Sequence, residues 1–202
     1  DLGRMLGFLA GSKAGMLLVG VASLEDSSLH GALLQSIGAG VALTGVLVVV
    51  RAIDARCGTR DVRHLGGLVA HAPRGAAAFF ILSCALVGFP GSLGFVGEDL
   101  LVHGVIHAHP IVATTLLFAT AMNGITMFRA YCRTFLGRPA DRPRTAGPLS
   151  VEDFLRRERA ATAALIVLLI GFGLAPSLLL DARREAVTAI ARSMAEVRAE
   201  AR

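Results

Sequence analysis

Apolar residues along the chain fall into long blocks that are separated by short polar segments. Five of these blocks are long enough for a helix to cross a hydrocarbon core, which takes roughly 20 residues. They cover residues 5–23, 29–53, 75–106, 111–134 and 160–180. The pattern predicts an all-α fold, a polytopic bundle of about five transmembrane helices within residues 1–182.

The third block, residues 75–106, is too long for one straight crossing and contains the run Gly88-Phe89-Pro90-Gly91. Proline removes a backbone donor and clashes with the preceding turn, and glycine loosens a helix further. Gly88, Pro90 and Gly91 therefore predict a break in the third helix.

Residues 183–202 have a different pattern, in which single apolar residues recur at helical spacing with charged residues between them. The apolar positions are Val187, Ile190, Met194 and Val197. This spacing predicts an amphipathic C-terminal helix that lies on the membrane or on a partner.

The composition favours a membrane protein over a soluble enzyme, because 54% of the residues are hydrophobic and only 17% are charged. A soluble domain has nearer a quarter of its residues charged. The net charge of +5 raises the alternative of a nucleic-acid partner. The chain has one Tyr and no Trp, however, and its arginines lie mainly between the apolar blocks. We therefore expect a lipid bilayer, and no nucleic acid, as its surroundings.

The distribution of arginine predicts the orientation in the membrane. The connectors 51–74 and 137–159 are rich in Arg, whereas the turns 24–28 and 107–110 contain no Lys or Arg. Basic loops stay on the cytoplasmic side of a membrane. We therefore expect both connectors to be cytoplasmic, in a bacterial inner membrane or an equivalent energy-coupling membrane.

Glu98 is the first candidate functional residue, because it closely follows the predicted break. An ionisable group inside a membrane is expensive and marks a functional site by default. An opened helix backbone can line a hydrated cavity, where a carboxyl group can carry protons. The alternative is structural, a carboxylate that pairs with a buried arginine or caps a half-helix.

Asp99, His103 and His107 recur at every fourth position, so they share one face of a helix. One interpretation is a proton wire that runs from the break towards the outer surface. A metal pair on the two histidines is a second interpretation, but no further ligand is evident and we predict no metal site. In the third, His107 and His109 simply lie at the membrane interface.

Lys13 lies in the middle of the first block, in Ser12-Lys13-Ala14-Gly15. A desolvated lysine can titrate near neutral pH. The alternative is an ion pair with a carboxylate from a neighbouring helix. A third possibility, that its side chain reaches to the membrane surface, is disfavoured by its distance from either end of the block. We expect Lys13 to be one of the proton-transfer residues.

Several short motifs occur in a fixed order. The most specific is Gly88-Phe89-Pro90-Gly91 followed by Gly94-Phe95-Val96-Gly97-Glu98, which reads G-x-P-G-x-x-x-F-x-G-E. Residues 59–68 read T-R-D-x-x-x-x-G-G-L. The remaining motifs are Asp1-Leu2-Gly3-Arg4-Met5-Leu6, Ser12-Lys13-Ala14-Gly15, Gly31-Ala32-Leu33-Leu34-Gln35, and Arg129-Ala130-Tyr131 with Phe135-Leu136-Gly137.

Together these motifs resemble the antiporter-like subunits of respiratory complex I, most closely its M-type subunit. Relatives of those subunits occur in membrane-bound hydrogenases and in multisubunit cation/proton antiporters. The resemblance covers nearly the whole chain but only the C-terminal part of the family's sequence. It implies that Glu98 is the broken-helix acid that hands protons towards the periplasm. It also implies partners, namely other antiporter-like and membrane subunits of a larger complex.

No motif for NADH, flavin, iron–sulfur or quinone binding is present, so we expect no cofactor and no catalytic residue in this chain. The resemblance places the redox module in other chains. Three positions depart from the family pattern, with Gly3 in place of a lysine and Lys13 and Ala39 in place of histidines. Two alternatives to proton translocation therefore stay open. One is a structural subunit with a non-conducting channel, and the other is a component of a multisubunit cation/proton antiporter.

Overall fold

The computed structural model describes residues 1–23, 25–107, 109–137 and 153–177, and every regular element in these ranges is helical. The α-helices are α1 (Leu2–Ala22), α2 (Asp26–Cys57), α3 (Pro73–Val87), α4 (Leu93–Ile106), α5 (Pro110–Tyr131) and α6 (Arg156–Leu174). A 3-10 turn, η1 (Leu68–Ala70), precedes α3, and a π-helical turn, η2 (Cys132–Leu136), extends α5. The predicted all-α bundle is confirmed. The amphipathic helix predicted for residues 183–202 lies outside the described residues.

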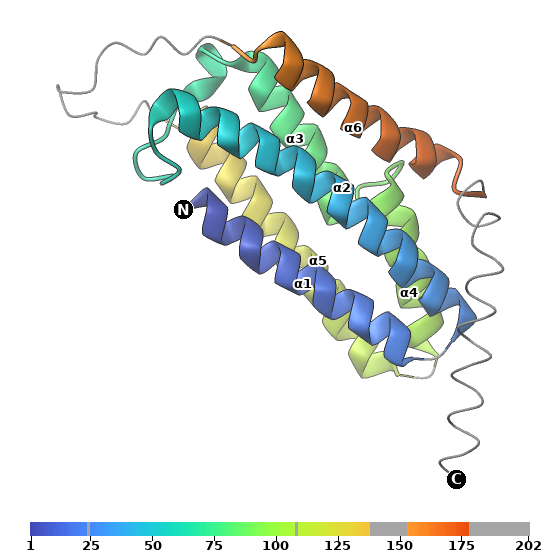
Figure 1. Cartoon of the computed structure of the whole chain (residues 1–202). Helices are drawn as coiled ribbons and strands as arrows, with labels where there is room; N and C mark the ends of the chain where they lie inside the picture. The colour runs from blue at the N-terminus through green and yellow to red at the C-terminus, as the bar shows by residue number, and fades with distance from the viewer. Residues whose placement is uncertain (24, 108, 138–152, 178–202) are drawn as a thin grey trace.

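The helices run side by side along one long axis (Figure 1). α2 is the central element, because it packs against α1, α3, α4 and α6. α5 closes the other side of the bundle through contacts with α3, α4 and α1. The site described below lies where α1, α2, α4 and α5 meet.

The predicted break in the third helix is confirmed. α3 ends at Val87, and α4 begins six residues later at Leu93. Gly88 and Gly91 have φ angles of 87° and 90°, in the left-handed region that favours glycine. The hydroxyl group of Ser92 caps α4 by accepting a hydrogen bond from the backbone N–H of Phe95. The third apolar block thus forms two shorter helices, α3 and α4, that the break separates.

Length and apolar character identify the molecule as an integral membrane protein. Within the described ranges, three helices are individually long and apolar enough to cross a membrane: Leu2–Ala22, Asp26–Cys57 and Pro110–Leu136. α5 also exposes large apolar side chains such as Ile111, Phe118 and Phe128, which suits contact with lipid tails. A chain with this surface belongs in a bilayer.

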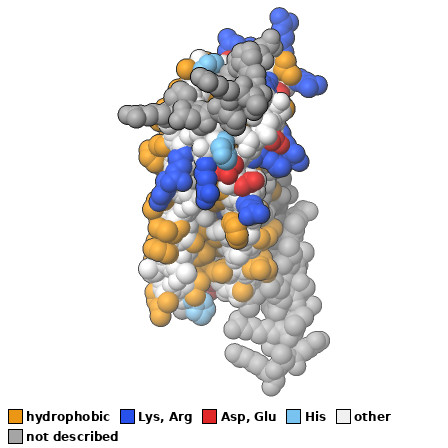
Figure 2. Space-filling model, turned by 90° about the vertical axis from the view of Figure 1, so that its left-hand side faces the viewer, with side chains coloured by type: hydrophobic (Ala, Val, Ile, Leu, Met, Phe, Trp, Pro, Cys, Tyr) orange, Lys and Arg blue, Asp and Glu red, His pale blue; other side chains and the backbone are white. Residues whose placement is uncertain are grey.

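One end of the bundle is basic. Here α1, α3 and α6 begin and α2 and α5 end, and the ends are tied together by ion pairs. Arg56 of α2 pairs with Glu158 of α6 at 2.6 Å, and Arg74 of α3 approaches Asp153 at 3.7 Å. Figure 2 shows charged side chains towards this end and hydrophobic side chains over the rest of the same face. We call this charged end the basic end; α4 ends and α5 begins at the opposite end.

The backbones of α2 and α4 are in contact because glycines line the interface between the two helices. A Cβ atom on Gly97 of α4 would lie 2.5 Å from the backbone nitrogen of Gln35 on α2. Gly31 and Gly104 make equally close approaches to Leu101 and Ser28. Small residues allow such close packing between membrane helices. This packing fixes the position of α4, and with it the position of Glu98, which follows Gly97.

Candidate functional site

Glu98 lies near the middle of the bundle, in the second turn of α4, and only 13% of its side chain is exposed. Its carboxylate forms an ion pair with the ammonium group of Lys13 on α1. The Lys13 side chain is 3% exposed, so both members of the pair are buried. The structure therefore brings together two of the residues that the sequence singled out.

Two further polar residues surround the Glu98 carboxylate. The Gln35 side chain, on α2, donates its Nε2–H to Glu98 Oε1 at 2.8 Å. Thr120, on α5, is a further hydrogen-bonding neighbour of the carboxylate. Helices α1, α2 and α5 thus each contribute one polar group to a carboxylate carried by α4. In the sequence Gln35 stands out only as the last residue of the motif Gly31-Ala32-Leu33-Leu34-Gln35, and Thr120 is one of several polar residues in its block and carries no signal of its own.

Gln35 is also incompletely satisfied. Its Oε1 atom is buried and accepts no hydrogen bond from any residue that the structure describes. A buried acceptor in this position can take a hydrogen bond from a water molecule. The orphaned oxygen therefore marks the Glu98 surroundings as a place suited to water.

A second polar contact lies beside Lys13. Asn123 of α5 donates its Nδ2–H to the hydroxyl oxygen of the adjacent residue, Ser12, at 2.9 Å. Asn123 is buried, and the bond joins α1 to α5 at the level of the ion pair. It holds the part of α1 that carries Lys13 against the bundle.

The helix break is part of the same site. A Cβ atom on Gly88 would lie 2.5 Å from Glu98 Oε2, so the carboxylate rests against the backbone of the break. Any side chain at residue 88 would press on the acid. Glycine is therefore required at this position for two reasons. It adopts the left-handed backbone conformation of the break, and it leaves room for the Glu98 carboxylate.

Asp99, His103 and His107 lie elsewhere. All three are exposed, on a face of α4 different from the one that carries Glu98. The rings of His103 and His107 meet edge to face, with their centroids 5.8 Å apart. The structure thus divides the five candidate residues into a buried pair and an exposed row. We call Asp99, His103 and His107 the outer strip.

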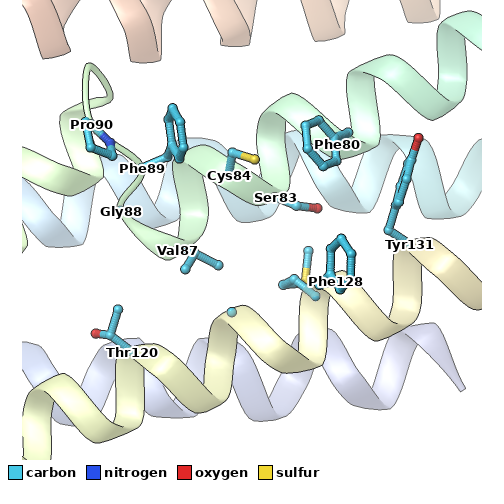
Figure 3. A pocket seen from close by; sticks show the side chains of 12 residues that line it. Phe80, Ser83, Cys84, Val87, Gly88, Phe89, Pro90, Thr120, Phe128 and Tyr131 are labelled. Atoms are coloured by element: carbon cyan, nitrogen blue, oxygen red, sulfur yellow. The ribbon is translucent and has the colours of Figure 1, made fainter.

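A pocket of about 420 Å³ lies between α3, the break and α5 (Figure 3). Its lining is mainly apolar: Phe80, Ser83, Cys84, Val87, Gly88, Phe89, Pro90, Thr120, Gly124, Met127, Phe128 and Tyr131. Gly88 and Thr120 line it and also neighbour Glu98. In Figure 3 Thr120 lies towards one end of the pocket, and Phe80 and Tyr131 lie towards the other. The pocket therefore adjoins the carboxylate at its Thr120 end.

The chemistry of this arrangement is that of a buried, titratable ion pair. Glu98 and Lys13 together carry no net charge, which suits a low-dielectric interior. A proton added to Glu98 would leave the charge of Lys13 uncompensated, so the protonation states of the two side chains depend on each other. Among the described residues, no three side chains of His, Cys, Asp or Glu are grouped for a metal ion.

Fold and site together define a class of protein. A discontinuous membrane helix with an ionisable group beside the break is the architecture of membrane proteins that move ions or protons. Residues 1–123 match the family model described as NADH:quinone oxidoreductase/Mrp antiporter, TM, and the chain belongs to this family.

Two of the similar curated proteins have the same name. NADH-quinone oxidoreductase subunit M of Rickettsia bellii is 28% identical over 181 residues, which cover 90% of this chain and 36% of the relative. The Rhodobacter capsulatus protein of the same name is 29% identical over 182 residues, which cover 90% of this chain and 35% of the relative. The chain thus spans a little over a third of the length of these relatives.

Two solved structures contain a similar fold. In respiratory complex I from Thermus thermophilus with bound NADH, the match has a TM-score of 0.81 at 26% identity, and covers 93% of this chain and 38% of that one. In the Mrp complex from Dietzia sp. DQ12-45-1b the TM-score is 0.73 at 22% identity, with 92% and 41% covered. The second match supports the fold alone. The resemblance predicted from the sequence motifs is confirmed.

Proposed function

We propose that this chain takes part in proton translocation as part of an antiporter-like membrane subunit of a larger energy-coupling complex, with Glu98 as the proton carrier. The observation that carries the proposal is the buried Glu98–Lys13 pair beside the helix break. The relatives named as subunit M of NADH-quinone oxidoreductase support the same function.

In this mechanism Glu98 and Lys13 pass on one proton at a time. The resting pair is neutral, and a proton that reaches Glu98 turns the carboxylate into a neutral acid. The buried ammonium group of Lys13 then lacks a counter-charge, and this drives the release of a proton from the pair. Gln35 keeps the carboxylate oriented through the hydrogen bond to Oε1. A water molecule on the orphaned Gln35 oxygen would extend the path by one step.

The surroundings of the chain belong to the same proposal. Other antiporter-like and membrane subunits surround the bundle, and the driving redox reaction takes place on other chains. The membrane is a bacterial inner membrane or an equivalent energy-coupling membrane. The basic end, with connectors 51–74 and 137–159, faces the cytoplasm, because basic loops stay on that side.

One observation favours a second candidate, a structural subunit with a non-conducting channel. Ala39 is buried on α2 one turn from Gln35, where the family pattern has a histidine. Alanine has no titratable group, so no side chain at this position can carry a proton along the path. A component of a multisubunit cation/proton antiporter is a third candidate, which the fold of the Mrp complex suits equally well.

The deciding experiment measures proton translocation in vesicles that contain the whole complex, with Glu98→Gln compared with the unaltered protein. Phe118→Leu, an exposed apolar position on α5, is the control. We expect Glu98→Gln to abolish most proton uptake while the complex stays assembled, and Phe118→Leu to leave uptake unchanged. Unchanged uptake in an assembled Glu98→Gln complex would show that the subunit is structural.

A further inference from the structure

The outer strip is a row of ionisable side chains on the surface of a membrane helix. The opposite face of α4 packs against neighbouring helices, with Leu101 and Val105 fully buried. Asp99, His103 and His107 face away from that core and are exposed. A lipid-facing helix surface normally carries apolar side chains, so this face of α4 requires an explanation of its own.

The strip extends from the end of α4 back towards the break. Asp99 precedes the end of α4, at Ile106, by seven residues, which is roughly 10 Å of helix. The strip is flanked by Phe95 and Ile106, two exposed apolar side chains. Asp99 therefore lies farther from this end of the bundle than His107, which directly follows the helix.

No cation on the described part of the chain compensates Asp99. The cationic side chains that form ion pairs, Lys13 and the arginines at the basic end, have other carboxylates as partners. The two imidazoles of the strip contact each other edge to face, and neither ring makes a hydrogen bond to another residue that the structure describes. The face thus offers one unpaired acidic group and two hydrogen-bonding rings in a line.

We propose that the outer strip is the contact face for a transmembrane helix of a neighbouring membrane subunit, which carries a Lys or Arg at the level of Asp99. The opposite charge pairs with the Asp99 carboxylate, and polar groups on the same helix bond His103 and His107. Lipid tails supply neither. The inference rests on the proposed function only in that the chain works inside a complex, and it does not require Glu98 to carry protons.

The test is site-specific photo-crosslinking in native membranes that contain the complete complex. A photoreactive amino acid replaces His103, and in the control it replaces Phe118, an exposed apolar residue of α5. We expect residue 103 to capture one membrane subunit, at a peptide from a transmembrane helix that contains Lys or Arg, and residue 118 not to capture that peptide. Adducts of residue 103 with lipid only, or with residues 178–202 of the same chain, would overturn the proposal.

Charge reversal gives a second, independent measurement. Asp99→Lys should reduce the amount of captured subunit that co-purifies with the chain by roughly ten-fold or more, since it places like charges together. Reversing the partner's basic residue to Asp should restore the amount. Unchanged co-purification of Asp99→Lys would contradict the proposal. Glu98→Gln should leave co-purification intact, so failure of the interface and failure of proton transfer give different results.

Discussion

Lys13 of α1 and Glu98 of α4 are 85 residues apart in the sequence and form one buried ion pair in the folded bundle. The pair brings a helix at the start of the chain into contact with the half-helix that follows the break. Gln35 adds a bond from α2 to the same carboxylate oxygen. The predictions below follow from this pair, from the break beside it, and from the ion pairs at the basic end.

Removal of one member of the pair should cost more than removal of both. Lys13→Met leaves a buried carboxylate without a partner, and we expect a loss of about 3–5 kcal/mol in stability. Lys13→Met combined with Glu98→Gln leaves no charge, so the double variant should recover much of that loss. Thermal unfolding of the purified complex in detergent measures both. If the stability losses of Lys13→Met and of Glu98→Gln, each made alone, add up to the loss of the double variant, the two side chains do not interact.

Gln35→Met should weaken proton transfer without destroying the fold. Methionine has a similar volume and no hydrogen-bonding amide, so the carboxylate loses the bond to Oε1. We expect a slower rate of proton uptake in vesicles and assembly similar to that of the unaltered protein. A rate equal to the unaltered protein's would contradict a positioning role for Gln35.

Gly88→Ala and Gly91→Ala form a matched pair, because both glycines have φ angles near 90°. Backbone strain of about 1–3 kcal/mol applies to each. At residue 88 the new methyl group also meets Glu98 Oε2, whereas at residue 91 it meets open space. We therefore expect Gly88→Ala to reduce proton uptake more than Gly91→Ala at a similar loss of thermal stability. Equal effects on uptake would mean that the break acts only through its backbone.

The Arg56–Glu158 pair at the basic end should make stability depend on acid pH. Burial, the largest influence, raises the pKa of Glu158, but the bonds from Arg56 and from the Leu155 N–H together lower that pKa below its ordinary value of 4.5. A lowered pKa in the folded state stabilises the fold above about pH 4.5, and the contribution disappears as the pH falls through the folded value.

We therefore expect Glu158→Gln to lower stability by about 1 kcal/mol at neutral pH and by progressively less as the pH drops below 4.5. Thermal unfolding at a series of pH values measures this difference. Arg60→Gln, which removes a more exposed pair with Asp54, is the matched control and should have a smaller effect at neutral pH. A difference that stays constant at acid pH would rule out the ion pair as its source.

Some of this structure was predictable from the sequence because the causes are local. The apolar blocks predict helices, and Gly88, Pro90 and Gly91 predict the break, since each acts on its own part of the backbone. The ion pair of Lys13 was one of two alternatives for a lysine in the middle of an apolar block. Its partner was not predictable, because the choice of carboxylate depends on which helices meet.

The sequence did not determine which of Glu98 and Asp99 points into the core of the bundle. The two residues are neighbours in sequence, and helical periodicity fixes only that they lie about 100° apart around α4. Which one faces the core depends on the packing of Gly97 against α2. Sequence spacing correctly grouped Asp99 with His103 and His107 on one face, but did not determine that this face is exposed.

The close packing of α2 against α4 also decides how firmly the Glu98 carboxylate is placed. A Cβ atom on Gly31, Gly97 or Gly104 would lie 2.3–2.5 Å from a backbone nitrogen of the facing helix. Larger residues at these positions would force the two helices apart. The location of the acid therefore depends on three glycines as much as on the bonds that Glu98 itself makes.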